Sequence, residues 1–145
     1  MSFEPTDSNA GATSPGDPPP ATSSRNGREI RPLLFEVAWE VCSQAGGIYT
    51  VLRSKAPSAV RRWGEGYYCI GPYHEAGARI EFEPQPLDGV VGEAVEELRS
   101  RGIEIHAGRW LITGRPKTLL INVNSVRDRL NEMKYFLYAD CGIGT

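Results

Sequence analysis

The sequence has few of the residues that build disulfide frameworks and metal sites. Among its 145 residues there are three cysteines and two histidines. The cysteines are odd in number and widely spaced, without a Cys-x-x-Cys pair, whereas small disulfide domains and zinc ribbons need paired cysteines. Histidines and carboxylates also lack metal-ligand spacing. We therefore expect no metal or other cofactor, a reducing, cytoplasmic location, and buried free thiols at Cys42, Cys69 and Cys141.

A large net charge and long apolar runs are also missing. The formal net charge is -2, and 23% of the residues are charged. This balance lacks the basic footprint that nucleic-acid binding requires. No apolar run approaches the roughly 20 residues that cross a bilayer, and the first residues lack the basic start and apolar stretch of a secretory signal. We expect neither nucleic acid nor a membrane as a partner.

The first 30 residues differ in composition from the rest. Small and polar residues dominate them, three prolines follow one another at Pro18–Pro20, and almost nothing large is available for burial. Such a segment cannot offset the entropy lost on ordering. We predict a disordered leader over residues 1–30 and a folded domain over residues 31–145. The leader is either an inert solvated tail or a phosphorylation target, with Ser14 before a proline.

From about Arg31 onward, apolar runs alternate with amphipathic stretches, which predicts an α/β sheet. Residues 33–38 are almost continuously apolar, as is typical of a parallel strand covered on both faces. The first helix should end or kink before Pro57, which lacks an N–H. Gly108 should turn a hairpin, and Ser125 should cap the last helix. The predicted strands are residues 33–38, 67–71, 80–83, 103–106, 110–112 and 118–123, and the predicted helices are residues 48–56, 58–63, 90–98 and 126–138.

The most informative local feature is the pair Gly46 and Gly47, which stands between the first predicted strand and the first predicted helix. Glycine lets a backbone approach a ligand closely, and a helix N-terminus offers unpaired N–H groups to an anion. The pair is therefore either a phosphate cradle or simply a tight turn. The sequence has no Gly-x-Gly-x-x-Gly and no Walker-type loop, which argues against dinucleotide and P-loop sites.

Several blocks of the sequence closely resemble fungal and animal glycogen synthases. They occur in that family's order, and together they cover the chain from Pro32 to its end. The resemblance implies a partial Rossmann-like N-terminal domain of a GT-B glycosyltransferase, truncated at residue 145. The blocks are LFEVAWEV at residues 34–41, GGIYTVL at 46–52, KA at 55–56, IGPY at 70–73, GRWLI at 108–112, SVR at 125–127, NE at 131–132 with Lys134, and Cys141 with Ile143-Gly144.

The resemblance also implies an activity. Enzymes of this family transfer glucose from UDP-glucose to the non-reducing end of glycogen, forming an α-1,4 bond with retention. By resemblance, Gly46, Gly47 and Gln44 would contact the donor, and the catalytic residues are expected beyond Thr145. The same resemblance implies glycogen as the acceptor, and glycogenin and homo-oligomer contacts through regions absent here. We expect this segment alone to be inactive.

Gln44 departs from the family pattern, because the family usually places Lys or Arg two residues before the glycine pair. An amide can donate a hydrogen bond but carries no charge to balance a diphosphate. Met133 and Tyr135 also depart, since Trp and Gly are usual there. The alternative function is therefore a non-catalytic interaction module, or a decayed copy, that docks with full-length synthase or carbohydrate.

Other residues have two readings each. Glu36 and Glu40 flank the end of the first predicted strand, and Glu36 either orients the glycine loop or forms a structural ion pair. Tyr49 either borders the donor site or packs in the core. Structural roles are expected for Trp110 in the core, for Arg109 paired with a carboxylate and for His106 on a predicted strand, whereas His74 is expected to be an exposed loop residue.

Overall fold

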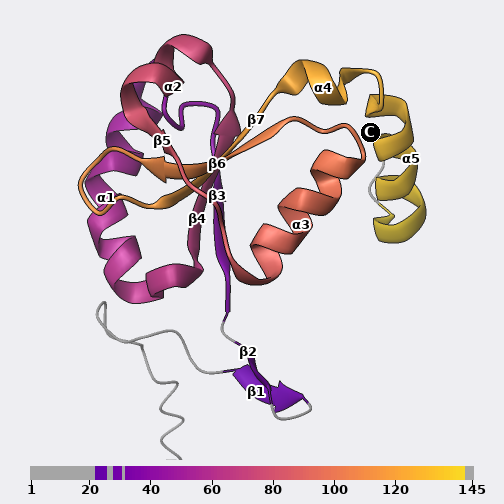
Figure 1. Cartoon of the computed structure of the whole chain (residues 1–145), viewed down its shortest axis with the longest axis horizontal. Helices are drawn as coiled ribbons and strands as arrows, with labels where there is room; N and C mark the ends of the chain where they lie inside the picture. The colour runs from indigo at the N-terminus through magenta and orange to yellow at the C-terminus, as the bar shows by residue number, and fades with distance from the viewer. Residues whose placement is uncertain (1–21, 26–27, 31, 143–145) are drawn as a thin grey trace, which may run out of the picture.

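The computed structural model describes residues 22–25, 28–30 and 32–142 (Figure 1). A five-stranded sheet runs through its centre, and a separate two-stranded antiparallel sheet is formed by β1 and β2. The strands are β1 (Thr22–Arg25), β2 (Arg28–Ile30), β3 (Leu34–Val37), β4 (Tyr67–Pro72), β5 (Phe82–Pro84), β6 (Ile105–Trp110) and β7 (Lys117–Ile121). The helices are α1 (Gly47–Trp63), α2 (Glu75–Glu81), α3 (Gly89–Ser100), α4 (Val123–Arg127) and α5 (Leu130–Cys141), with a 3-10 turn at Gly64–Gly66.

The central sheet is mostly parallel, in the order β3-β4-β7-β6-β5. β3, β4 and β7 are parallel neighbours, and β6 runs against both β7 and β5. The predicted α/β class is therefore confirmed. β3 is one of the two edge strands, and the loop that leaves its carboxyl end leads to the start of α1.

Helices cover both faces of the sheet, with α1 and α2 on one side and α3 on the other (Figure 1). The alternation of a strand sends successive side chains to opposite faces. In β4, Tyr67 and Cys69 therefore pack with α1, whereas Tyr68 packs with α3. The α1 side contains Tyr49, Leu52, Ala56, Trp110 and Leu120, and the α3 side contains Val91, Val95, Ile105, Ala107 and Leu119.

α1 continues through Pro57 as one helix, so the predicted end or kink before that residue is wrong. A proline inside a helix costs about 3 kcal/mol or more. Here tertiary packing holds the helix in place. Ala56 is fully buried, and Gly114 lies so close that a Cβ there would be 3.1 Å from the Pro57 Cα.

The strand predicted over residues 80–83 is half correct, because residues 80 and 81 are helical and residues 82 and 83 belong to a strand. α2 runs to Glu81, and the edge strand β5 begins only at Phe82. Ile80 is 77% exposed, so its alternation with Phe82 does not reflect burial. Long-range hydrogen bonds to the Glu81 carboxylate, which local sequence does not reveal, hold this end of α2.

Gly108 lies in the middle of β6, so the predicted hairpin at this glycine is wrong. A Cβ at Gly108 would overlap the Glu83 carbonyl oxygen on the neighbouring strand. Its role is to let β5 approach closely, which is a common reason for a glycine inside a strand. The strand pair that it permits places Trp110 opposite Phe82.

The end of the chain contains two helices, whereas the sequence predicted one over residues 126–138. α4 is capped by Asn122, whose side chain accepts from the Asn124 N–H at 3.1 Å. Ser125 is therefore not the cap. Its hydroxyl donates to the Asn122 carbonyl at 2.7 Å and accepts from the Glu104 N–H at 3.0 Å.

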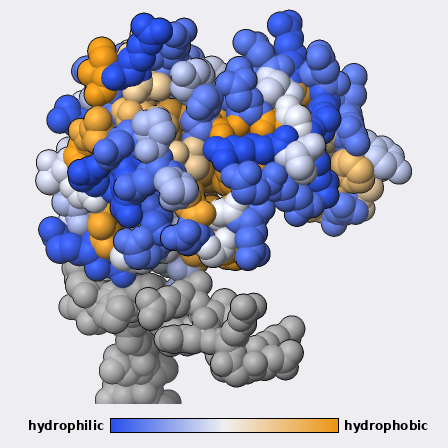
Figure 2. Space-filling model, viewed as in Figure 1, coloured by the Kyte–Doolittle hydropathy of each residue, from blue (hydrophilic) through white to orange (hydrophobic). Residues whose placement is uncertain are grey.

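Some apolar side chains lie at the surface. Figure 2 shows hydrophobic residues between hydrophilic ones on the face viewed. On and just after β3, Val37 is 73% exposed and Trp39 is 67% exposed. No residue of α5 is buried, including Met133 and Tyr135. None of the described helices combines the length and apolar character needed to cross a bilayer.

Most of the expected leader, residues 1–21, lies outside the described residues. Within the remainder, the structure describes β1 and β2 as an antiparallel pair. The division into a leader over residues 1–30 and a domain over residues 31–145 stays a prediction. The described helices and the central sheet all lie within residues 32–142.

Candidate functional site

The glycine turn, residues 44–49, leads from the loop after β3 into the first turn of α1. Gly46 is the N-cap of the helix and has an extended backbone, with a φ of -161°. The Oε2 atom of Glu40 accepts from the Gly46 N–H at 2.8 Å and from the Tyr49 N–H at 2.9 Å. A single carboxylate therefore clamps the turn at two points.

Two N–H groups at this helix start are left over. The first four N–H groups of an α-helix have no partner within the helix, and here they belong to residues 46–49. Glu40 takes the first and the last. The N–H groups of Gly47 and Ile48 have no hydrogen-bond partner among the residues that the structure describes. Adjacent, unpaired and next to the positive end of the helix dipole, they can bind an anion.

The two glycines of the turn have different surroundings. A Cβ at Gly46 would lie 3.0 Å from the Glu40 Oε1 atom, so this glycine admits the carboxylate. A Cβ at Gly47 would meet nothing within 4 Å. Packing within the described chain therefore does not require a glycine at position 47, and the space beside it is open.

Gln44 lies at the start of the same turn and is exposed. Its side chain makes no hydrogen bond to any other described residue. Nothing in the structure therefore holds the amide away from the open side of the turn. The assignment of Gln44, Gly46 and Gly47 to a donor site stays a prediction.

Glu36 serves the core rather than the turn. It forms an ion pair with Lys55 of α1 and accepts from the Tyr67 hydroxyl at 2.5 Å. Burial and the bond to Glu36 raise the pKa of Tyr67 above its ordinary range. Of the two readings of Glu36, the structural ion pair is confirmed. The carboxylate that orients the glycine loop is Glu40. Its position just past the strand could be predicted from the sequence, but its hydrogen bonds to the loop could not.

Tyr49 is a core residue. Its side chain is 4% exposed, its ring lies 5.8 Å from that of Trp110, and its hydroxyl donates to Glu81 at 2.5 Å. Burial, together with the bond to Glu81, raises the pKa of Tyr49. The reading in which Tyr49 packs in the core is confirmed.

Trp110 and Arg109 have the structural roles that the sequence predicted. Trp110 is fully buried, and its indole N–H donates to Glu81 at 3.1 Å. Arg109 lies 3.6 Å from the Glu65 carboxylate. Glu65 also pairs with Lys117, and that ammonium is the main cause of the lowered pKa of Glu65.

Neither histidine bonds to the glycine turn. His106 stacks on Tyr73 with ring centroids 4.0 Å apart and lies 2.9 Å from Glu104. His106 is the first cause of the lowered pKa of Glu104, and Asn122 is the second. His74 stands at the N-cap position of α2, where its side chain makes no capping bond.

The cysteines are free thiols, as predicted, but they are not equally buried. Cys42 and Cys69 lie in the core under α1, whereas Cys141 is exposed on α5, so the expectation of burial is wrong for Cys141. Burial raises the pKa of Cys69 to about 11. Within residues 32–142, no three His, Cys, Asp or Glu side chains come close enough together to hold a metal ion.

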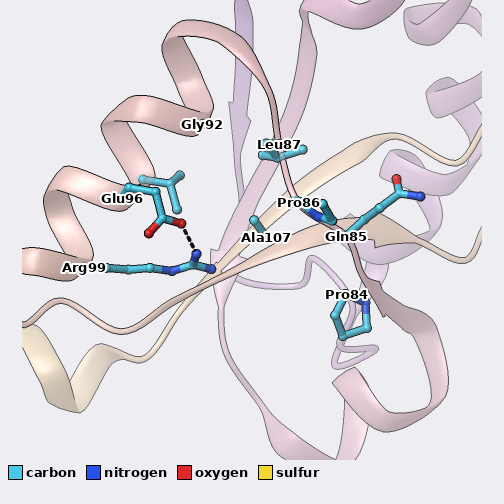
Figure 3. A pocket seen from close by; sticks show the side chains of 9 residues that line it. Pro84, Gln85, Pro86, Leu87, Gly92, Glu96, Arg99 and Ala107 are labelled. Carbon is cyan, nitrogen blue, oxygen red and sulfur yellow. Dashed lines mark hydrogen bonds and ion pairs between the residues drawn. The ribbon is translucent and has the colours of Figure 1, made fainter.

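A cavity of about 340 Å³ lies between α3, β6 and the loop that precedes α3 (Figure 3). It shares no lining residue with the glycine turn. Its main charged groups already bond within the protein. Arg99 donates to the Ile105 carbonyl at 2.7 Å and pairs with Glu96, a bond drawn in Figure 3. The cavity therefore does not extend the site at α1.

Comparisons with known proteins agree with the resemblance of the blocks. A glycogen synthase family model matches residues 36–145. The rat liver protein named glycogen [starch] synthase is 42% identical over 113 residues, which are 77% of this chain and 16% of the relative. The Caenorhabditis elegans and Dictyostelium discoideum proteins of that name are 37% and 40% identical over 84% and 72% of this chain, and 18% and 12% of their own lengths.

The chain thus spans about a sixth of the length of the curated liver relatives that it matches. The region matched by the family model contains the glycine turn, Glu40, the end of β3 and the four other strands of the central sheet. Because the family model covers most of the chain and animal relatives share about 40% of its residues there, this chain belongs to the glycogen synthase family.

Proposed function

We propose that this chain supplies part of the donor site of a retaining glycosyltransferase that moves glucose from UDP-glucose to the non-reducing end of glycogen. The open start of α1 is the observation that carries the proposal. There, the free N–H groups of Gly47 and Ile48 face no protein partner among the described residues, and no atom lies within 4 Å of a Cβ built at Gly47. The donor's diphosphate is the anion that this turn would take.

The position of the turn supports this proposal. Ligands of open α/β sheets bind outside the carboxyl ends of the parallel strands. The glycine turn follows the carboxyl end of β3, and β3 is parallel to β4 and β7. The proposed fold is therefore Rossmann-like, as one lobe of a two-lobed GT-B enzyme. The relatives' names, glycogen [starch] synthase, give the product class.

The chain's own residues would bind and orient the donor rather than break its glycosidic bond. Two adjacent backbone N–H groups can donate to one phosphate oxygen, and the exposed Gln44 amide can add a third donor. Transfer also needs the acceptor held in line with the donor. We therefore propose that the catalytic residues, and the contacts with glycogen, glycogenin and other subunits, come from sequence beyond Thr145, in a cytoplasmic enzyme. The 145-residue segment alone should not transfer glucose.

Titration of the ¹⁵N-labelled chain with UDP-glucose tests the site. We expect the amide resonances of Gly47 and Ile48 to shift, and we expect Gly47→Val to lose most of the binding. Gly47→Ala is the matched variant, because alanine is the better helix former and the space is open. It should unfold in urea no earlier than the parent chain while binding UDP-glucose more weakly.

Three other results would count against the donor site. Shifts confined to residues away from the turn would move the site elsewhere. Unchanged affinity in Gly47→Val would show that the donor does not bind beside position 47. Binding of maltooligosaccharide without binding of UDP-glucose would favour the alternative function, a non-catalytic module that docks with carbohydrate.

A further inference from the structure

We propose that Glu40 is a positioning residue of the donor site, a role that rests on the proposed function. Its carboxylate fixes the glycine turn so that two N–H groups of the helix start stay available for the donor diphosphate. The residue touches neither glucose nor the reacting atoms. It acts through the backbone of the turn.

The hydrogen bonds at the start of α1 carry this inference. Four N–H groups need partners outside the helix. Glu40 Oε2 accepts from the outer two, on Gly46 and Tyr49, at 2.8 and 2.9 Å. The inner two, on Gly47 and Ile48, have no partner within the described part of the chain. The carboxylate thus brackets the free pair from both sides.

The two hydrogen bonds of Glu40 join residues that are separated in the sequence but close in space. Glu40 lies six residues before Gly46 and nine before Tyr49, so its two bonds close the whole loop between β3 and α1. A loop of mostly exposed residues, from Gln44 to Ile48, would otherwise sample many backbone conformations. Ordering the donor groups before the ligand arrives lowers the entropy that binding must offset.

Gly46 fits the same arrangement. Its Cβ would stand 3.0 Å from the Glu40 Oε1 atom, the oxygen that does not bond to the turn. A side chain at this position would push the carboxylate, while the backbone at a φ of -161° is accessible to any residue. The missing side chain at Gly46 therefore leaves room for the Glu40 carboxylate, and the missing side chain at Gly47 leaves room for the ligand. This division gives each glycine its own reason to lack a side chain.

The opposite role for Glu40 is also physically reasonable and is distinguished by the sign of one effect. A carboxylate beside a helix start can compete with an incoming anion, because both are attracted to the same dipole. If Glu40 competes, its removal strengthens binding. If it positions, its removal weakens binding. If it only stabilises the fold, binding by the folded protein does not change.

The experiment measures the affinity of the ¹⁵N-labelled 145-residue chain for UDP-glucose and, separately, for inorganic pyrophosphate. We expect Glu40→Ala to weaken binding of both probes about tenfold, the scale of one hydrogen bond to a charged group. Glu40→Gln, whose amide oxygen can still accept, should keep the affinity within about threefold of the parent. Tighter or unchanged binding in Glu40→Ala would overturn the positioning role.

Glu36→Gln is the matched control. It removes the charge of a neighbouring glutamate that pairs with Lys55 and Tyr67 and makes no bond to the turn. It should lower the stability of the chain and leave the affinity of the folded protein unchanged. An equal loss of affinity in Glu36→Gln and Glu40→Ala would show a general effect of destabilisation and would also overturn the proposal.

A double-mutant cycle with Gly46 adds a second readout. Gly46→Ala should weaken binding about threefold in the parent chain by displacing the carboxylate, and it should have no further effect in Glu40→Ala. Additive losses would overturn the link between the two residues. If the unmodified chain binds neither probe, the donor site and the role of Glu40 fail together. If it binds and Glu40→Ala binds equally well, only the role of Glu40 fails.

Discussion

The starts of α1 and α3 show how differently two glycine-containing helix starts can behave in one small fold. At α1 the turn is open: Glu40 takes two N–H groups, and nothing lies near a Cβ at Gly47. At α3 the chain closes on itself, because a Cβ at Gly92 would overlap the carbonyl oxygen of Leu87. Gly92 of α3 is explained by the protein's own packing. Gly47 is not explained by packing among the described residues, because the space beside it is open.

The largest expected effect is on α3. Gly92→Ala should destabilise the chain by about 3 kcal/mol, since the new methyl group has to displace the backbone at Leu87. Gly47→Ala, at the first residue of α1, should change the stability by no more than about 0.5 kcal/mol or raise it slightly. Urea unfolding of both variants measures the difference. Equal destabilisation would break the contrast between the two helix starts.

The two faces of the sheet should also respond differently to alkaline pH. Cys42 and Cys69 lie only on the α1 side, and burial raises the pKa of Cys69 from 9.0 to about 11. Because the pKa of the thiol is higher in the folded than in the unfolded chain, the neutral thiol contributes fully to the free energy of unfolding below pH 9. This contribution is lost as the pH rises toward about 11. Hydrogen exchange across this range should report earlier opening of α1 than of α3. Cys69→Ala should reduce the difference, and a simultaneous loss of both helices in the parent would contradict it.

The Glu81 carboxylate ties α1 to α2 and β6 by accepting from Tyr49 and Trp110, whereas α3 is tied to β6 by Arg99, which donates to the Ile105 carbonyl. Tyr49→Phe removes the hydroxyl that donates to Glu81 at 2.5 Å, leaving only the Trp110 indole among the side-chain donors. We expect a loss of about 1–2 kcal/mol in the free energy of unfolding. Tyr73→Phe, which removes the hydroxyl from the ring that stacks on His106, is the control and should cost less. Equal losses would show that the Glu81 contacts add nothing beyond burial.

The smallest expected effect concerns Gln44 in the open turn. A cation there should strengthen the contact with a diphosphate, but exposure limits the gain to about tenfold or less. In a chimera that joins this chain at Thr145 to the remainder of a liver relative, Gln44→Lys should lower the KM for UDP-glucose or raise turnover. An unchanged KM and unchanged kcat would show that the charge is irrelevant. Stability should not change, because Gln44 bonds to no described residue.

Local sequence patterns predicted the elements that depend on neighbouring residues, and they missed the features that depend on contacts with distant residues. The strands at β3, β4 and β7, the helix after the glycine pair, and the burial of Trp110 all follow from short apolar runs. Pro57 lies inside α1, where Gly114, far along the chain, packs against it. Gly108 is a strand residue because β5 approaches it. Neither partner is visible in a window of ten residues.

The candidate site also has residues that the sequence could identify and contacts that it could not. Gly46 and Gly47 were found by their position between a strand and a helix, together with the family blocks. Glu36 and Glu40 both flank the end of the predicted strand, and the loop-orienting role was considered only for Glu36, as one of two readings. Both residues are glutamates at the end of one apolar run, and only the loop's folded path decides which carboxylate reaches the Gly46 and Tyr49 N–H groups.

The most direct test is glucose transfer by the chimera. We predict that the chimera incorporates labelled glucose from UDP-glucose into glycogen. Gly47→Val should reduce that rate at least a hundredfold, the order of effect expected when the donor is misplaced, while melting at the same temperature as its parent. Full activity of the Gly47→Val chimera, at unchanged stability, would contradict the claim that the open start of α1 holds the donor.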